Sequence, residues 1–106
     1  MILSGIATKE ISMIKVIARS IIKENYLPEA LHLYQLLVQE TVKEQGCFSY
    51  ELFQELDNPN NLTEIEEWED LEALKRHTET SHFITLVQQL SQFEKELPVL
   101  LYKKLF

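Results

Sequence analysis

The chain has 106 residues, enough for one domain, and its 45% apolar and 25% charged content is typical of a folded globular protein. Its formal net charge of −7 argues against nucleic acid and anionic membranes as partners, because phosphate binding needs clustered lysine and arginine. With a single cysteine, Cys47, and no basic leader before an apolar run, we expect no disulfide and a cytoplasmic location.

Residues 13–23 predict the first strand, which follows an N-terminal extension (residues 1–12) and opens a domain of residues 13–106. The segment is rich in β-branched residues, which favour strands. One face would carry Ile14, Val16, Ala18 and Ile22, and the other Ile17 and Ile21 with Lys15 and Arg19. A strand with apolar residues on both faces needs cover on both sides. We therefore expect helices on one side and a second subunit on the other.

Pro28 and Glu29 indicate the first turn of a helix that continues to Gln45, where Gly46 supplies a left-handed cap. Apolar residues recur along it at helical spacing, as Leu27, Leu31, Tyr34, Leu37, Val38 and Thr41. Residues 47–56 then alternate in the manner of a half-buried strand. Its inward face is predicted to hold Phe48, Tyr50, Leu52 and Leu56.

Turn-forming residues at 57–61 join this strand to another at 62–68, making a hairpin. Asp70 can cap a short helix that runs to His77, and Thr80 or Ser81 begins a longer one that Pro98 ends. The longer helix would bury Phe83, Leu86, Val87, Leu90, Phe93 and Leu97. Residues 99–105 form the last strand. The order β-α-β-β-α-β predicts the ferredoxin-like α+β fold, an antiparallel sheet with helices on one face.

Four phrases, in this order, resemble the antibiotic biosynthesis monooxygenase family across residues 13–106. The stretch MIKVIAR at residues 13–19 is similar to its first strand. EQGCFSYEL at residues 44–52 resembles its "PGCLSYEL" segment, with glutamine in place of the usual proline. EEWED at residues 66–70, with Ala73, Leu74 and His77, matches its "EEWED…AL…H" pattern. TSHF at residues 80–83 is similar to its "TPHF" motif.

This resemblance implies a homodimer of the dimeric α+β barrel type, with a pocket between sheet and helices in each subunit. Some members oxidise phenols or quinols with O2 without metal or flavin, some degrade haem, and some rearrange a phosphorylated sugar. The haem-degrading members use an Asn, a Trp and a His where this chain has Ala18, His77 and Val87, so haem degradation is disfavoured. Members that oxidise polyketides line the pocket with an Asn and a Trp; Trp68 matches the Trp, and Glu64 replaces the Asn.

His77 and His82 are the candidate catalytic residues, because histidine accepts protons readily near neutral pH. Removing the phenolic proton leaves an electron-rich phenolate that gives up an electron more easily. The alternative is that each ring caps a helix or bonds a neighbouring carbonyl. A metal is not expected: five positions along a continuous helix would set the rings about 140° apart, and no cysteine or further histidine cluster completes a site.

The predicted substrate-pocket residues are Trp68, Tyr34, Tyr50, Glu64, Phe83 and Arg19. Trp68 could stack on a flat ring, and the tyrosines could offer hydroxyls, although packing in the core is the alternative for each. Glu64 and Glu66 could be paired carboxylates or could be solvated at a hairpin edge. Residues 51–72 contain nine acidic residues and no basic one, which is typical of a solvated surface. Cys47 has no histidine near it in sequence, so a nucleophilic role is not expected.

We therefore expect a cofactor-independent monooxygenase that acts with O2 on a small phenol, quinol or similar aromatic molecule. An isomerase or lyase of a small phosphorylated metabolite is an alternative, for which Arg19, Lys75 and Arg76 would have to supply the phosphate site. A dimeric module that binds a small ligand without turnover is a third possibility.

Overall fold

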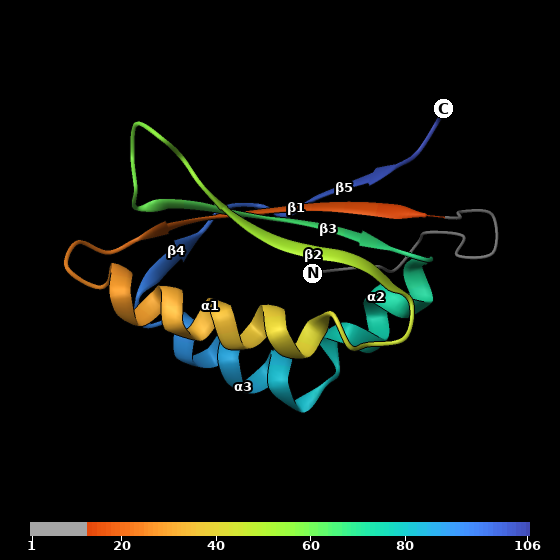
Figure 1. The fold of residues 1–106 in the computed structure, drawn as a ribbon, viewed down its shortest axis with the longest axis horizontal. Coiled ribbons are helices and arrows are strands. Elements are labelled where there is room, and N and C mark those ends of the chain that lie inside the picture. Colours follow the sequence, from red (N-terminus) through yellow and green to blue (C-terminus); the bar gives the residue numbers. More distant parts are fainter. Residues whose placement is uncertain (1–12) are drawn as a thin grey trace.

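The computed structural model describes residues 13–106, an antiparallel sheet with three helices on one face (Figure 1). The expected N-terminal extension, residues 1–12, lies outside the described residues. The elements are β1 (Ile14–Ile22), α1 (Leu27–Thr41), β2 (Cys47–Gln54), β3 (Asn61–Trp68), α2 (Leu71–Thr78), α3 (Ser81–Leu90), β4 (Glu94–Glu96) and β5 (Leu100–Lys103). The predicted ferredoxin-like α+β fold is confirmed.

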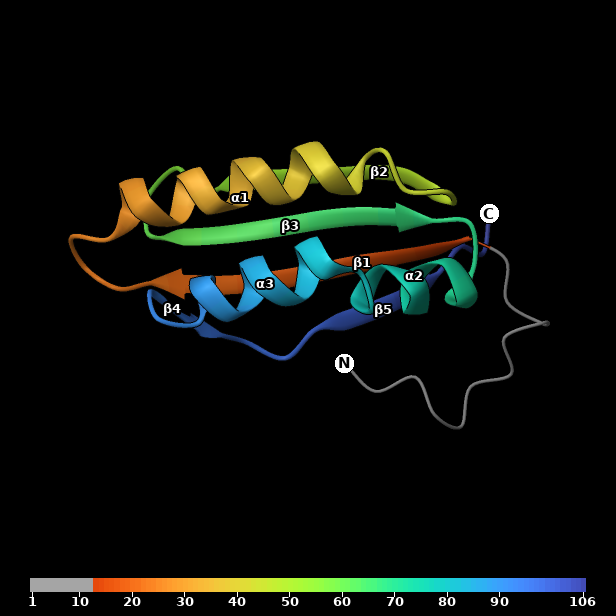
Figure 2. The same cartoon turned by 90° about the horizontal axis from the view of Figure 1, so that it is seen from below.

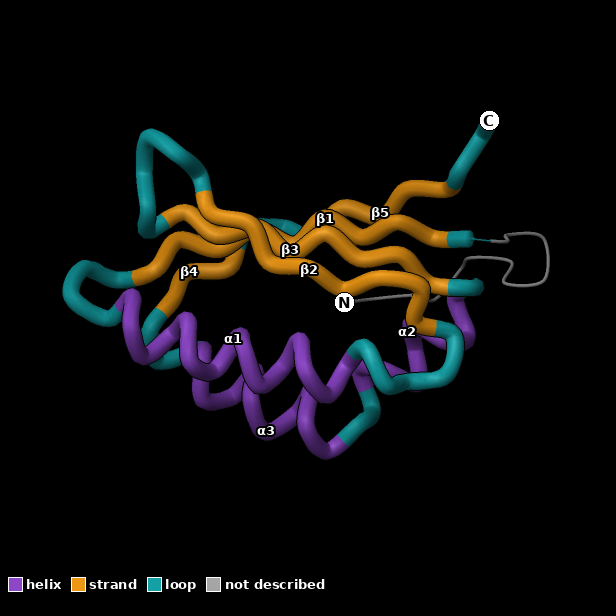
Figure 3. The backbone as a smooth tube through the Cα atoms, in the orientation of Figure 1, coloured by secondary structure: helices purple, strands orange, loops and turns teal. Residues whose placement is uncertain are grey.

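The strands follow the order β2-β3-β1-β4, and β5 also pairs with β1 (Figure 3). β4 pairs with residues 20–22 of β1, whereas β5 pairs with residues 14–17, so the fourth strand is built in two pieces along one edge. Between them, the Leu97 amide donates to the Arg19 carbonyl at 3.0 Å. The segment of residues 97–99 therefore interrupts the edge opposite the middle of β1.

The faces of β1 divide as its alternation predicts. Ile14, Val16, Ser20 and Ile22 are buried toward the helices, and Lys15, Arg19 and Ile21 are exposed on the other face. Figure 2 shows α1 and α3 lying side by side across the sheet, with α2 at the Ile14 end of β1. In the part of the chain that the structure describes, no helix is long and apolar enough to cross a membrane.

Local signals set most element starts. Asp70 accepts from the Ala73 amide at 2.8 Å and Thr80 from the Phe83 amide at 3.2 Å, so each caps the helix that follows it. α1 ends at Thr41 rather than at the predicted Gln45. Beyond Thr41 the chain continues in tight turns. Val42 is half exposed and residues 43–45 are polar, so this segment has no apolar side chain that packs on the sheet and extends the helix.

Two predicted inward residues of the second strand are wrong. A register shift between Cys47 and Ser49 inserts an extra residue, and this turns Phe48 outward to 59% exposure. Leu56 lies beyond the end of β2 and is fully exposed. Tyr50 is buried and Leu52 half buried, as expected.

The predicted long helix up to Leu97 is also wrong beyond Leu90. Glu94–Glu96 forms β4, and the Lys23 amide donates to the Phe93 carbonyl at 2.7 Å. The free edge of β1 offers backbone partners for this segment, and that pairing overrides the apolar periodicity that would have continued a helix.

We predict that Gly46→Ala lowers the free energy of unfolding by about 2–4 kcal/mol. Gly46 has φ +86°, and an added Cβ would lie 2.6 Å from the Ala73 Cβ. Urea unfolding of Gly46→Ala, Ala73→Gly and the double variant separates the two causes. Ala73→Gly removes the overlap, so the pair should cost less than the sum of the single changes. Strict additivity would contradict the steric contribution.

Candidate active site

A cavity of about 220 Å³ lies between the sheet and the helices. Of the eight site residues predicted from the sequence, six line it: Arg19, Tyr34, Tyr50, Glu64, His77 and Phe83. The strand register sets where the acidic residues lie along the cavity. Glu64 pairs with Ala18 in the middle of β1, and Glu96 pairs with Ser20 nearer its Ile22 end. Val16 and Ser20, on either side of Ala18 on the same face, are buried, and the small side chain of Ala18 leaves room for the cavity between them.

His77, near the end of α2, is held by a carboxylate. Its Nδ1 lies 2.8 Å from Oε2 of Glu44, and its side chain is 2% exposed. Since a carboxylate can only accept, Nδ1 carries the hydrogen and the neutral ring keeps its lone pair on Nε2. Burial lowers the pKa of His77, outweighing the opposing effect of Glu44. His77 is thus a neutral, oriented proton acceptor on the cavity wall.

Aromatic rings surround the imidazole. The ring centroids of Trp68 and Phe83 lie 4.7 Å from that of His77, and Tyr50 lies at 5.4 Å. Trp68 is fully buried, is not part of the cavity lining, and donates from Nε1 to Glu66 Oε1 at 2.9 Å. Its observed position is in the core behind His77, which is the packing alternative weighed from the sequence.

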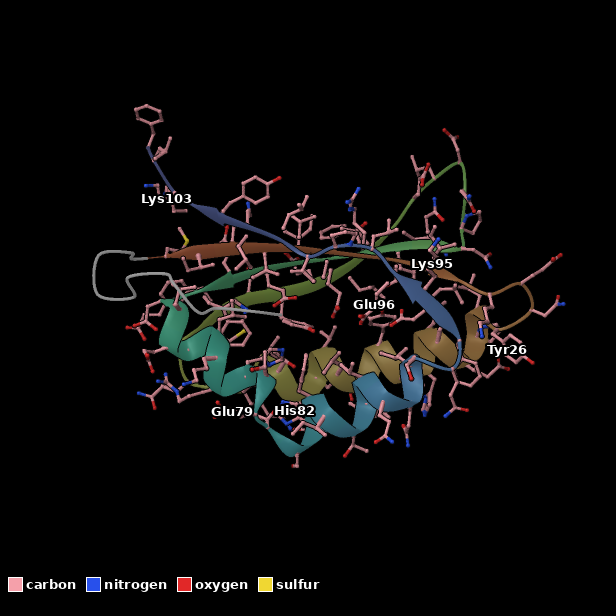
Figure 4. All side chains as sticks on the ribbon, turned by 180° about the vertical axis from the view of Figure 1, so that it is seen from behind. Tyr26, Glu79, His82, Lys95, Glu96 and Lys103 are labelled. Atoms are coloured by element: carbon pink, nitrogen blue, oxygen red, sulfur yellow. The ribbon has the colours of Figure 1, made fainter. Side chains whose placement is uncertain are left out.

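His82, at the start of α3, also falls outside the cavity lining. Its Nε2 lies 2.7 Å from the same Glu44 oxygen. Figure 4 labels His82 where α3 begins. The two histidines therefore meet through Glu44, across the break between α2 and α3. His82 holds the carboxylate that orients His77.

Glu44, His77 and His82 could together hold a metal ion, since one ligand atom of each lies within 4.8 Å of the others. The third possible ligand, Glu44, comes from the turn after α1 and is far from both histidines in the sequence. In the structure the ligand atoms are at hydrogen-bond separations of 2.7 and 2.8 Å, and each ring donates to the carboxylate. The same three groups are thus linked by hydrogen bonds in this structure.

Glu64 and Glu66 are buried, at 9% and 4% exposure, so the expected solvation at a hairpin edge is wrong for both. β3 is an inner strand and turns these side chains toward the helices. Burial raises the pKa of Glu64 well above its usual range, with Glu66 adding repulsion, and raises the pKa of Glu66 to about 7. Two carboxyl groups with raised pKa values therefore line the cavity.

The far end of the cavity holds a third buried acid, Glu94 of β4. The Tyr34 hydroxyl donates to Glu94 Oε2 at 2.5 Å and lies 3.2 Å from Ser20 Oγ. Burial raises the pKa of Tyr34 above its ordinary value, and nearby Glu64 and Glu94 add to this effect. Tyr34 is therefore a neutral hydrogen-bond donor that is already engaged by an acid.

Sequence reasoning missed Glu44, Glu94 and Glu96 as site residues. Glu44 stood within a family-like phrase, but its partners are 33 and 38 positions away in the chain. Glu94 and Glu96 were assigned to a helix, which hid the alternation that turns both toward the cavity. For Cys47, burial raises the pKa of the thiol to about 11, so it is a poor nucleophile at neutral pH, as expected.

We predict that Glu66→Gln stabilises the fold at high pH. The folded-state pKa of about 7 exceeds the usual 4.5, so the native carboxyl favours folding below pH 4.5 and loses that contribution as pH rises through 7. Urea unfolding at pH 8 should show the variant ahead by up to about 3 kcal/mol, with the difference vanishing near pH 4. Exposed Glu51→Gln is the control, and parallel pH curves for Glu66→Gln and the native chain would refute the prediction.

Comparison with known proteins places this geometry in a family. "Putative monooxygenase YcnE" of Bacillus subtilis (strain 168) is 39% identical over 61 residues, 58% of this chain; the match spans only 60% of that relative's length. A conserved protein from Methanosarcina mazei Go1 superposes with a TM-score of 0.83 at 34% identity, covering 91% of this chain and 96% of its own.

A solved antibiotic biosynthesis monooxygenase superposes with a TM-score of 0.77 at 34% identity, over 86% of this chain and 95% of its own. The family profile described as antibiotic biosynthesis monooxygenase matches residues 13–89, well over half of the sequence. The family phrases recognised in the sequence supply the hairpin, the histidines and the turn that carries Glu44. The chain belongs to the antibiotic biosynthesis monooxygenase family.

Proposed function

We propose that this protein is a cofactor-independent monooxygenase that oxidises a small phenol or quinol with O2. Family membership supports oxygenation, and one observation supports the chemistry: a neutral histidine on the wall of a partly aromatic cavity, fixed at Nδ1 by Glu44. The orienting carboxylate also stabilises the imidazolium that forms when Nε2 takes a proton. We place the reaction in the cytoplasm, as expected from the sequence.

The proposed reaction begins with transfer of the phenolic proton to Nε2 of His77. The phenolate then gives electrons to O2, one oxygen atom is inserted into the ring, and the other leaves as water. A phenol and O2 thus give a quinone and water, with the substrate supplying all the electrons. Phe83, Leu37, Val87 and Leu90 provide apolar walls that keep bulk water from the reactive intermediate.

The cavity argues against a phosphorylated substrate. Glu64, Glu66, Glu94 and Glu96 line it. Among the described lining residues the one of permanent positive charge is Arg19, whose side chain is exposed on the other face of β1. Lys75 and Arg76, which an isomerase or lyase would have needed, are exposed and outside the lining. A phosphate would meet repulsion from the carboxylates at short range. Binding without turnover is the remaining alternative, and the oxygen assay below decides it.

We also propose that the protein acts as a homodimer through the helix-free face of the sheet. That face carries apolar side chains at Ile17, Ile21, Phe53, Ile65, Leu100 and Tyr102. Ile21, Phe53 and Tyr102 are 40–50% exposed, which is an unusual density of exposed apolar groups for a monomer. A second copy of this face would bury them.

We predict that the protein consumes O2 with some member of a panel of small phenols and quinols, and that His77→Gln lowers the initial rate by about 10²–10⁴-fold. The rate should also rise with pH until His77 is neutral, because protonated imidazole cannot accept the phenolic proton. An oxygen electrode and metal-chelated buffer measure both effects.

His32→Gln is the matched control, because His32 is exposed on α1 and outside the cavity lining. The control should keep the full rate. Equal rates for His77→Gln and His32→Gln would overturn the role of His77. Ligand binding with no oxygen uptake for any compound would favour the binding module.

We predict that Ile65→Glu converts a dimer to a monomer, because the new charge would have to be buried between two sheets. Analytical ultracentrifugation should show the sedimenting mass halved. Leu36→Glu, on the exposed surface of α1, is the control and should remain dimeric. A monomeric native chain, or a dimeric Ile65→Glu, would rule out this interface.

A further inference from the structure

The acidic lining exceeds what abstraction of a phenolic proton requires. Glu64 and Glu66 come from β3, and Glu94 and Glu96 from β4, whereas Arg19 alone supplies a permanent positive charge among the described lining residues. Three of the four acids are buried, which is costly for carboxyl groups without compensation. Figure 4 shows Glu96 on the helix-facing side of β4, with Lys95 turned to the other side.

Each of the three buried acids has a protein donor, Tyr50 in the case of Glu64, but one oxygen of Glu64 lacks a partner. Glu66 accepts from Trp68 Nε1, and Glu94 accepts from the Tyr34 hydroxyl. Glu64 is 9% exposed, yet its Oε2 is sealed from solvent and has no hydrogen-bond partner among the described residues. Thr41 Oγ1 and Asn61 Oδ1 are also unpartnered, but of the three only the Glu64 oxygen belongs to a residue that lines the cavity. Because buried polar atoms are nearly always partnered, this oxygen marks the position of a donor that the described residues do not supply.

The cavity is also divided in character along β1. Toward Ile14 it is bounded by His77 and Phe83, and toward Ile22 by Glu94, with Glu64 opposite Ala18 between them. Val16 and Ser20 are four residue steps apart on the strand, a span of about 13 Å. At about 220 Å³ the cavity is smaller than the sites that hold drug-sized ligands. It suits a single ring with a short side chain.

We infer that the cavity selects a small arylalkylamine. Its ring would lie against His77 and Phe83, and its protonated nitrogen would donate to Glu64, which lies between those two residues and Glu94. This deepens the proposed function and rests on it for the identity of the oxidised ring, which would be a phenol carrying an aminoalkyl chain. An ammonium group supplies both the missing donor and the missing positive charge. The desolvated ion pair is stronger than the same contact in water.

Binding of a cation should release protons. Burial and neighbouring acids raise the pKa values of Glu64 and Glu94, and a bound ammonium favours their ionised forms. The other titratable groups that line the cavity with them are Tyr34, Tyr50, Glu66, His77 and Glu96, and the charged Arg19 lies beside it with its side chain on the other face of β1. Calorimetry in two buffers of different ionisation enthalpy measures this release directly.

The test titrates the full chain, without O2, with 4-hydroxyphenethylamine and with its uncharged counterpart 4-hydroxyphenethyl alcohol. Isothermal calorimetry and the fluorescence of Trp68, the single tryptophan, report binding independently of turnover. We expect the amine to bind at least about tenfold more tightly than the alcohol and to release protons, whereas the alcohol releases none. Equal affinities, or a preference for the alcohol, would overturn the inference.

Glu64→Gln should weaken amine binding by about 10- to 100-fold while leaving alcohol binding little changed. Glu94→Gln should act in the same direction, and exposed Glu24→Gln should have no effect. Undiminished amine binding by both cavity variants would refute the assignment of these acids. Selective amine binding without oxygen uptake would leave this inference standing and sink the proposed oxidation, while oxygen uptake without amine selectivity would do the reverse.

Discussion

The carboxylate of Glu44 determines how the site is assembled. It follows α1, and it accepts from His77 at the end of α2 and from His82 at the start of α3. One oxygen thus joins three segments and sets the tautomer of the buried His77 ring. The turn that carries Glu44 is fixed as well, because the Gly46 carbonyl accepts from the Glu69 amide at 2.8 Å. A change at Gly46 would therefore reach the imidazole through two residues of backbone, without touching the cavity.

Local signals in the sequence were sufficient for the topology and for part of the site. The alternation of β1, the caps at Asp70 and Thr80 and the left-handed Gly46 each express a short-range preference that the fold retains. Periodicity failed where a long-range partner decided the outcome. Residues 94–96 have apolar neighbours at helical spacing, yet the open edge of β1 offers hydrogen bonds that a helix continuing past Leu90 would leave unused. Phe48 was misplaced because a bulge shifts the period by one residue.

The site itself was predictable only as far as the family phrases and single residues allowed. His77, Phe83, Tyr34 and Tyr50 line the cavity, whereas Trp68 packs behind it. The acids were misread because a run of charge in sequence says nothing about which alternate residues face inward. Alternation along the predicted strand already sets Glu64 and Glu66 on the same face as Trp68, but only the pairing of β3 with both β1 and β2 shows that this is an inner strand with that face buried. Charge patterning along the chain therefore understates the polarity of this interior.

The broken fourth strand has a consequence for behaviour in concentrated solution. A free sheet edge exposes unpaired backbone groups on which another chain can add as a strand. Here one edge consists of three residues in β4 and four in β5, separated by a segment containing Pro98, which has no amide hydrogen to donate. The opposite edge, β2, is interrupted by its bulge near Cys47. Among the described residues, the β4–β5 edge therefore offers no long, flat template on which a further strand could add.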